Sequence, residues 1–260
     1  MRFARYKNGI SSTFGIVSGE LLEDIHGTPF GAYEKTGMTH HLDAVELLVP
    51  FKPRTFYAAG INYTEHIKEI AAQQGRDPNF PEKPDIGYRA NNALIAHGQP
   101  IVKPKDATDH LQYEGELVVV IGKQAKNVSF DEALECVLGY TIGNDVSERT
   151  WQASDRTFWR AKNSDTFKPM GPWIETQVDL DLMRTTVRLN GAMVSEFSTN
   201  SMVFGIGTYI TTMTKYLTLY PGDMIWMGTD GATQNMKIGD VCEIEIEGIG
   251  VLRNLIVGEE

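Results

Sequence analysis

One apolar run, residues 117–122, constrains the fold of this chain more than any other segment. Its sequence is Leu-Val-Val-Val-Ile-Gly, so a strand built from it would be apolar on both faces. Such a strand must be covered on both sides, which places it inside a sheet rather than at an exposed edge. We therefore expect a buried central strand around which the rest of the chain is organised.

Few helices interrupt a chain whose other segments have the pattern of short strands separated by turns. A helix is predicted over residues 64–74, with Thr64 as its cap. Ser129 and Glu132 form a capping box that opens a second helix, and residues 201–213 predict a third. The pattern as a whole predicts an α+β fold that is rich in β-structure.

The chain divides into a short first part and a long second part. Residues 1–52 contain short strands and turn residues, and some fifty residues are few for an independent core. We expect a small N-terminal β domain there, packed on a main domain that spans residues 53–260.

Composition excludes several classes of function. Lys plus Arg number 24 against 34 Asp plus Glu, which gives a net charge of −10 and disfavours binding to nucleic acid. The two cysteines lack the spacing of a zinc or disulfide framework. The first residues contain no apolar signal segment, and no apolar run approaches 18 residues. We expect a cytoplasmic protein that does not act at a membrane.

Two acidic residues, Glu114 and Glu116, directly precede the apolar run. Side chains two residues apart on a strand point to the same side, so both carboxylates would share one face. Neighbouring carboxylates beside an apolar run are costly unless a cation or strong donors compensate them. A divalent ion that prefers oxygen ligands, Mg²⁺ or Mn²⁺, would do so. The alternative is a solvated strand edge, as we expect for Glu243 and Glu245, which alternate with apolar residues.

A third oxygen ligand is available at Asp145. It follows the apolar run over residues 137–143, where a strand would end and present side chains to a site. An ordinary turn or helix cap in Asn144-Asp145-Val146-Ser147 is the alternative. The residues thus predict a candidate three-carboxylate metal site, but they do not identify a reaction.

A candidate base and a candidate cation lie elsewhere in the chain. His66 and Glu69 are three residues apart on the predicted helix, so their side chains share a face. A carboxylate beside an imidazole orients it and raises its basicity, which suits a general base; a simple surface pair is the alternative. Lys162 follows the aromatic residues Phe158 and Trp159, where a lysine either stabilises an oxyanion or is a solvated surface residue.

Taken in order, these segments resemble the fumarylacetoacetate hydrolase family over about residues 57–256. The ordered series carries the resemblance, because each motif is short. The matching segments are Gly60-Ile61-Asn62-Tyr63 with His66 and Glu69, Tyr113-Glu114-Gly115-Glu116-Leu117, Asn144-Asp145-Val146-Ser147-Glu148-Arg149 with Gln152, Lys162 through Asp165 with Gly171-Pro172-Trp173, and Gly228-Thr229.

The resemblance implies a mixed β-roll, barrel-like catalytic domain with a small N-terminal domain, usually in a homodimer. It implies Mg²⁺ or Mn²⁺ on Glu114, Glu116 and Asp145, chelated by the adjacent oxygens of a 2-oxo acid or 1,3-diketone. The other roles it implies are water activation by His66 oriented by Glu69, oxyanion stabilisation by Lys162, and substrate binding by Arg149, Gln152 and Thr229.

Two segments depart from the family pattern. The usual Phe-x-Lys appears here as Gly87-Tyr88-Arg89, which keeps a cation but changes its reach, so we expect Tyr88 and Arg89 at the substrate pocket. The usual Gly-Thr-Pro-x-Gly appears as Gly228-Thr229-Asp230-Gly231-Ala232, an acidic and more flexible turn. Both changes bear on the choice of substrate.

From the residues and the resemblance we expect a metal-dependent hydrolase of carbon–carbon bonds in acylpyruvate-like or 1,3-dicarbonyl compounds, of the kind met in aromatic compound catabolism. A decarboxylase of an oxaloacetate-like 2-oxo acid, or an isomerase, is the alternative on the same metal site. A non-catalytic metal-binding or ligand-binding protein is a third hypothesis. The pair of His66 and Glu69 favours hydrolysis, because that reaction needs a base to activate water.

Overall fold

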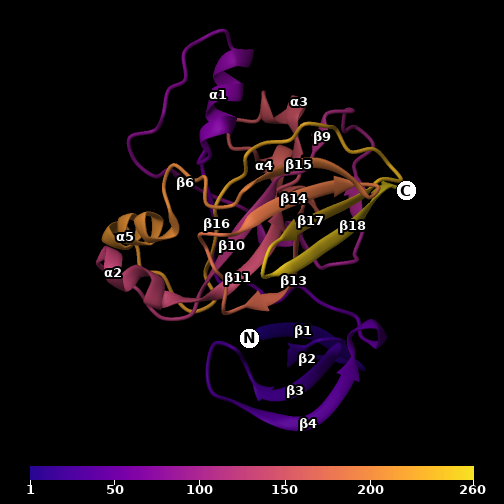
Figure 1. Cartoon of the computed structure of the whole chain (residues 1–260). Helices are drawn as coiled ribbons and strands as arrows, with labels where there is room; N and C mark the ends of the chain where they lie inside the picture. The colour runs from indigo at the N-terminus through magenta and orange to yellow at the C-terminus, as the bar shows by residue number, and fades with distance from the viewer.

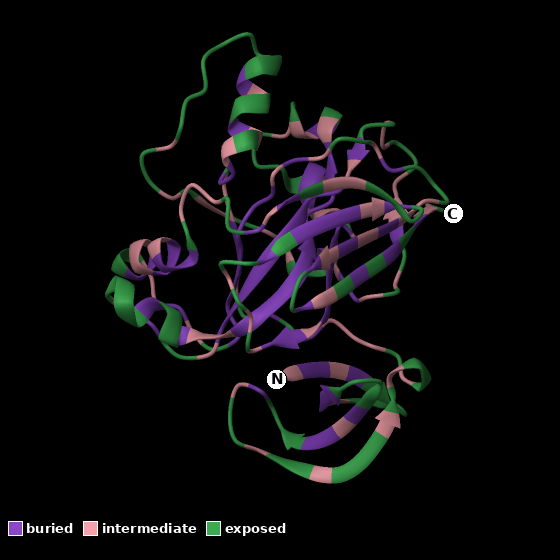
Figure 2. Cartoon of the chain, in the orientation of Figure 1, coloured by how far each residue is buried: buried purple, intermediate pink, exposed green.

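A computed structural model describes the whole chain, residues 1–260. Two β-sheets form its centre, and short helices lie at the periphery (Figure 1). The central strands are buried, whereas the helix α1 (Thr64–Gln73) and the loop after it are largely exposed (Figure 2). The β-rich α+β architecture expected from the sequence is confirmed.

The larger sheet holds eleven strands. They are β1 (Arg2–Asn8), β2 (Ser11–Ser18), β3 (Leu21–Gly27), β4 (Tyr33–His41), β5 (Phe56–Ala59), β6 (Ile86–Tyr88), β7 (Leu94–Ile95), β10 (Gly115–Ile121), β11 (Val137–Asn144), β13 (Lys168–Glu175) and β16 (Met224–Trp226). Their order is β4-β3-β2-β1-β13-β11-β10-β16-β5-β6, and β7 pairs with β13. The strand β10 lies between β11 and β16 and all seven of its residues are buried, as the apolar run predicts.

The second sheet covers one face of the first. Its order is β15 (Ala192–Ser198), β14 (Arg184–Leu189), β17 (Val241–Ile246), β18 (Gly250–Gly258) and β8 (Ile101–Lys103). Leu117 and Val119 of β10 belong to the same buried cluster as Ile244 of this sheet, whereas Val118 and Val120 belong to a cluster on the other face. Apolar cover on both sides explains why β10 carries no polar residue after Glu116.

The remaining elements are short. A two-stranded ladder joins β9 (Leu111–Gln112) to β12 (Ser147–Glu148), and 3₁₀ helices lie at Leu42–Ala44, Asn91–Ala93 and Leu134–Cys136. The other helices are α2 (Phe130–Ala133), α3 (Arg149–Gln152), α4 (Trp159–Asn163) and α5 (Ile206–Tyr216). The longest helix, α5, has 11 residues, so none of the helices could span a bilayer.

The helices predicted from local sequence patterns are present, but one predicted cap and one predicted starting point are wrong. The capping box is confirmed, because Ser129 Oγ accepts from Glu132 N at 3.3 Å and Glu132 Oε2 accepts from Ser129 N at 2.9 Å. Thr64 is the first helical residue of α1 rather than its cap, which is Tyr63. The predicted third helix begins five residues late, since the segment before Ile206 is tied to Asn62, whose side-chain oxygen accepts from Phe204 N at 3.0 Å.

The N-terminal strands β1 to β4 form an antiparallel meander that continues the larger sheet. Pairing of Phe3 in β1 with Ile174 in β13 joins the two parts edge to edge. Phe3 also shares a buried cluster with Phe56 and Trp226 of the main part. Because the parts share a sheet and a cluster, the division between residues 1–52 and residues 53–260 stays a prediction.

Candidate active site

Strand register brings three carboxylates together. In the antiparallel pair of β10 and β11, Gly115 lies opposite Asn144, so Glu114 and Asp145 face each other just beyond the ends of the strands. Asp145 N donates to Glu114 O at 2.9 Å and fixes this approach. Ligand oxygens of Glu114, Glu116 and Asp145 all lie within 4.8 Å of one another, and the three residues are at most 4% exposed.

Gly115, between the two glutamates, packs closely against the second sheet, which leaves little room for a side chain there. A Cβ at Gly115 would lie 3.1 Å from Ile244 and 3.3 Å from Val187, both in the second sheet. Glu114 and Glu116 therefore point away from that sheet, and both line a cavity on the other side. The sequence Glu-Gly-Glu thus places two carboxylates on one face and close packing on the other.

Four cations surround these carboxylates. Lys162 of α4 contacts Glu114 Oε2 at 2.5 Å and Asp145 Oδ2 at 3.0 Å through its Nζ. The other three ion pairs join Arg149 NH1 to Glu114 Oε1 at 2.6 Å, Arg89 NH2 to Asp145 Oδ2 at 2.9 Å, and Lys168 Nζ to Asp145 Oδ1 at 2.6 Å. Glu116 has no ion pair; its Oε2 accepts from Gly228 N at 2.8 Å.

This unequal pairing separates the acidities of the three carboxyls. Burial opposes ionisation of Asp145, but Arg89 and the two lysines outweigh it and hold the pKa of Asp145 well below its usual value. Burial likewise opposes ionisation of Glu114, and Lys162 outweighs it, so the pKa of Glu114 is lowered. At Glu116, burial and the charges of Asp145 and Glu114 raise the pKa to about 8. Two carboxylates are thus ionised and the third retains its proton at neutral pH.

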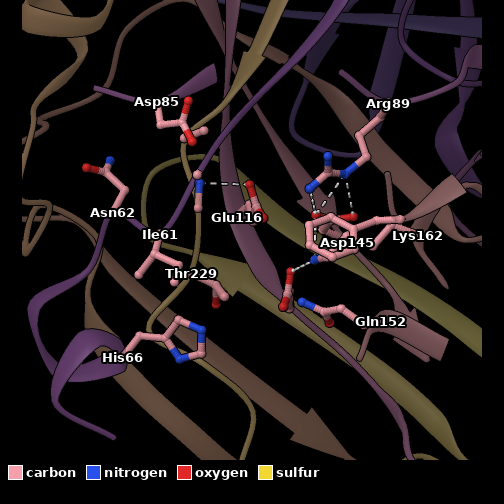
Figure 3. Close-up of a pocket in the computed structure, with 15 residues that line it drawn as sticks. Ile61, Asn62, His66, Asp85, Arg89, Glu116, Asp145, Gln152, Lys162 and Thr229 are labelled. Atoms are coloured by element: carbon pink, nitrogen blue, oxygen red, sulfur yellow. Dashed lines mark hydrogen bonds and ion pairs between the residues drawn. The ribbon is translucent and has the colours of Figure 1, made fainter. Parts of the chain in front are cut away.

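A cavity of about 310 Å³ opens onto this cluster. Figure 3 shows Arg89, Asp145, Lys162 and Gln152 gathered on one side and His66 entering from the other. The arrangement places a histidine across the cavity from the cation-rich side, with Glu116 and Thr229 between.

His66 lines the cavity, and one of its ring nitrogens is unpaired. Burial lowers the pKa of His66, and the nearby Glu114 only partly offsets it, so the imidazole is neutral near pH 7. Its Nδ1 is buried and has no hydrogen-bond partner. The expected hydrogen bond or ion pair with Glu69 is not formed, although both side chains line a neighbouring cavity. Both side chains approach Gly231, where a Cβ would lie 2.8 Å from His66 Nδ1 and 3.3 Å from Glu69 Oε2.

The residues expected to bind substrate are distributed unevenly. Gln152, Thr229 and Arg89 line the cavity. Arg149 does not; it forms an ion pair with Glu114 and lines the neighbouring cavity. Tyr88 is not brought to the site, because its side chain is 62% exposed and its ring packs 5.4 Å from that of Tyr57.

Sequence reasoning missed one charged residue of this cluster. Lys168 is fully buried in β13, where its Nζ also donates to the carbonyls of Val146 at 3.0 Å and Phe167 at 2.8 Å. Burial lowers the pKa of Lys168 to about 8, although Asp145 opposes this. The available signal was a lysine inside the apolar segment Phe167-Lys168-Pro169-Met170, since a buried lysine requires a charged partner.

The donor set fits a divalent cation that prefers oxygen. All three candidate ligands are carboxylates, and their oxygens are close enough to share one ion. Glu116 in particular is a buried carboxyl without a counter-charge, which a cation would supply. We find no histidine or cysteine in the cluster that would favour a softer metal.

The chain matches two family models. Residues 55–257 match the model described as fumarylacetoacetate (FAA) hydrolase C-terminal, and residues 1–50 match one described as Rv2993c-like, N-terminal. The first range includes every residue of the cavity.

Relatives match over most of the chain. Protein Rv2993c of Mycobacterium tuberculosis is 38% identical over 99% of this chain and 98% of its own length. A crystal structure of 5-carboxymethyl-2-hydroxymuconate delta-isomerase from Mycobacterium smegmatis is 36% identical, covers both chains completely and has a TM-score of 0.89. A 4-hydroxyphenylacetate degradation bifunctional isomerase/decarboxylase of Salmonella dublin is 38% identical over 79% of this chain and 47% of its own length.

Proposed function

The chain belongs to the fumarylacetoacetate hydrolase family, and from this premise we propose that it is a metal-dependent hydrolase of carbon–carbon bonds in acylpyruvate-like or 1,3-dicarbonyl compounds. Enzymes with this fold catalyse several reactions, so the choice among them must come from the site. One observation carries it: the buried carboxylate cluster shares a cavity with a lysine and with a neutral histidine whose Nδ1 is free.

The carboxylates of Glu114, Glu116 and Asp145 would hold Mg²⁺ or Mn²⁺. A bound ion of this kind polarises the carbonyl of a 2-oxo acid and favours its enolate. The chain's own cations fix the ligands beforehand, because Lys162, Arg89 and Lys168 all form ion pairs with Asp145. The cluster is thus preorganised, which is what electrostatic catalysis requires.

His66 is the proposed general base. Its imidazole is neutral at pH 7 and can take a proton from a water molecule in the cavity. The water oxygen then bonds to the acyl carbonyl carbon, and the bond between that carbon and the neighbouring CH₂ breaks. Its electron pair passes to the pyruvate enolate, which regains a proton from the imidazolium. The products are a carboxylic acid and pyruvate.

Lys162 is the proposed stabiliser of negative charge in this reaction. Two of its three N–H groups contact Glu114 and Asp145, which leaves one for an oxyanion. Arg89 and Gln152 line the same side of the cavity, and we assign them contacts with substrate oxygens. Thr229 also lines the cavity, in a turn where its Oγ1 accepts from Gly231 N at 3.4 Å, and we assign it the same role.

An isomerase or a decarboxylase is the second candidate. The printed names of the Mycobacterium smegmatis and Salmonella dublin relatives favour it. Loss of carbon dioxide needs no attacking water, so a decarboxylase would depend on Lys162 and the metal ligands but little on His66. A change at His66 therefore separates the hydrolase from the decarboxylase.

The test compares His66→Ala with His41→Ala, a histidine exposed on the N-terminal meander. With an acylpyruvate as substrate, His66→Ala should lower kcat by about 10²–10⁴-fold, the usual contribution of one general base. The affinities for Mn²⁺ and for pyruvate should not change, because the carboxylates and cations stay in place. Hydrolysis at the wild-type rate by His66→Ala would refute the mechanism.

The assembly is a further part of the proposal. The family resemblance implies a homodimer, and we propose that this chain forms one. Light scattering on the purified protein should give twice the mass of 29.0 kDa; a mass of one chain at micromolar concentration would contradict this.

A further inference from the structure

A second cavity of about 560 Å³ adjoins the site, and the proposed mechanism does not use it. His66, Gln152 and Phe158 line both cavities, so the two meet at these side chains. We call the second one the outer cavity. It lies between the last turns of α1 and the segment that leads from α3 to α4. A substrate whose oxo-acid end lies at the carboxylates would extend its other end into this space.

Hydrogen-bonding groups of the outer cavity are mainly amides. Four glutamines line it, at positions 73, 74, 112 and 152. Arg149 orients two of them, because its Nε donates to Gln112 Oε1 at 2.7 Å and its NH1 donates to Gln152 Oε1 at 2.8 Å. With its carbonyl held in this way, Gln152 has its NH₂ group left to donate, at the point where the two cavities meet.

The charges of the outer cavity do not suit an anion. Arg149 is the only cation in its lining, and an ion pair with Glu114 at 2.6 Å neutralises it. Glu69 adds a carboxylate to the same lining. A second carboxylate on a substrate would be repelled by Glu69, and no unpaired cation is present in the lining to balance it. Placing it there would therefore cost free energy.

We propose that the outer cavity selects a substrate whose far end is uncharged and carries hydroxyl groups. A hydroxyl both donates and accepts, so it can donate to Glu69 and accept from a glutamine NH₂ group of the same lining. Ile70 and Phe158 supply apolar surface for the carbons between. This inference rests on the proposed function for the oxo-acid end alone, and it adds the chemical class of the far end.

The experiment measures binding rather than turnover. Three ligands that share the 2-oxo acid group are titrated into the Mn²⁺-loaded full chain by calorimetry: pyruvate, 6-hydroxy-2-oxohexanoate and 2-oxoadipate. The last two have equal length and differ in a terminal hydroxyl or carboxylate. The hydroxyl compound should bind about tenfold or more tightly than 2-oxoadipate.

A charge-reversing variant tests the position of the far end. Gln73→Arg places a cation in the outer cavity and should remove or invert the preference, whereas Gln124→Arg, in an exposed segment elsewhere, should retain it. Pyruvate should bind all three proteins equally. Equal or tighter binding of 2-oxoadipate by the wild type would overturn the inference while leaving the proposed function intact. Failure of pyruvate itself to bind would overturn the oxo-acid site, and with it this extension.

Discussion

Metal affinity at this site should fall steeply as the pH is lowered, because Glu116 must lose a proton to become a ligand. Burial and the neighbouring charges of Asp145 and Glu114 raise the pKa of Glu116 to about 8 in the metal-free protein. The pKa values of Glu114 and Asp145 are lowered, so neither adds a proton to the exchange near neutral pH. Metal binding therefore competes with one proton.

The magnitude follows from that single competition. For a ligand with a pKa of about 8, the apparent affinity changes by about 50-fold between pH 8 and pH 6. At pH 7 about 0.9 proton should be released for each ion bound. Lys168 titrates in the same range and its ammonium repels the ion, so its contribution has the same sign.

In the metal-free protein, the free energy of unfolding changes with pH in the opposite direction to the metal affinity: it falls as the pH rises. The folded state retains a proton on Glu116 up to about pH 8, whereas the unfolded chain releases it near pH 4.5. The stabilisation present below pH 4.5 is therefore lost as the pH rises towards 8, by up to about 1.4 kcal/mol per pH unit. Saturating Mn²⁺ should restore stability most at the upper end of this range.

The assay is titration calorimetry with Mn²⁺ at several pH values, in buffers of different ionisation enthalpy. Glu116→Gln should bind weakly and with much less dependence on pH, and Glu245→Gln, on the half-exposed outer face of β17, should behave as the wild type. An affinity that is constant from pH 6 to 8, or the absence of proton release, would refute the reasoning.

Two further predictions concern residues next to the site. Lys168→Met should destabilise the metal-free fold by about 3 kcal/mol in denaturant titration, because it leaves part of the buried charge of Asp145 unpaired; an unchanged midpoint would show that Arg89 compensates. Gly231→Ala should lower kcat without changing Mn²⁺ affinity, because the residue has φ +105° and its new Cβ would lie 2.8 Å from His66 Nδ1; wild-type turnover would contradict this placement of His66.

Where the sequence predicted correctly, a single local pattern was sufficient. The run at residues 117–122 has no polar side chain on either face, and only an interior strand accommodates that. Once β10 is central, antiparallel pairing with β11 places Asp145 opposite Glu114. The proximity of the three carboxylates thus depends on strand register. That register is indicated by the alternation of side chains along each strand and by the positions at which the strands end.

Where the sequence failed, contacts between distant segments decide the outcome. Spacing on a helix suggested a pair of His66 and Glu69, but the turn at Gly231 lies against both side chains and the pair is not formed. Likewise, Lys168 pairs with Asp145 only because β13 lies next to β11. Tyr88 was expected in the pocket with Arg89, yet neighbouring residues at a strand end point to opposite sides, and only Arg89 turns inward.

The proposed reaction is tested most directly by incubating the Mn²⁺-loaded protein with acylpyruvates in H₂¹⁸O and identifying the products by mass spectrometry. Hydrolysis predicts equal amounts of pyruvate and a carboxylic acid, with one ¹⁸O atom in the new carboxyl group of the acid. Intact acylpyruvates, together with release of carbon dioxide from oxaloacetate, would contradict the hydrolase and establish the decarboxylase in its place.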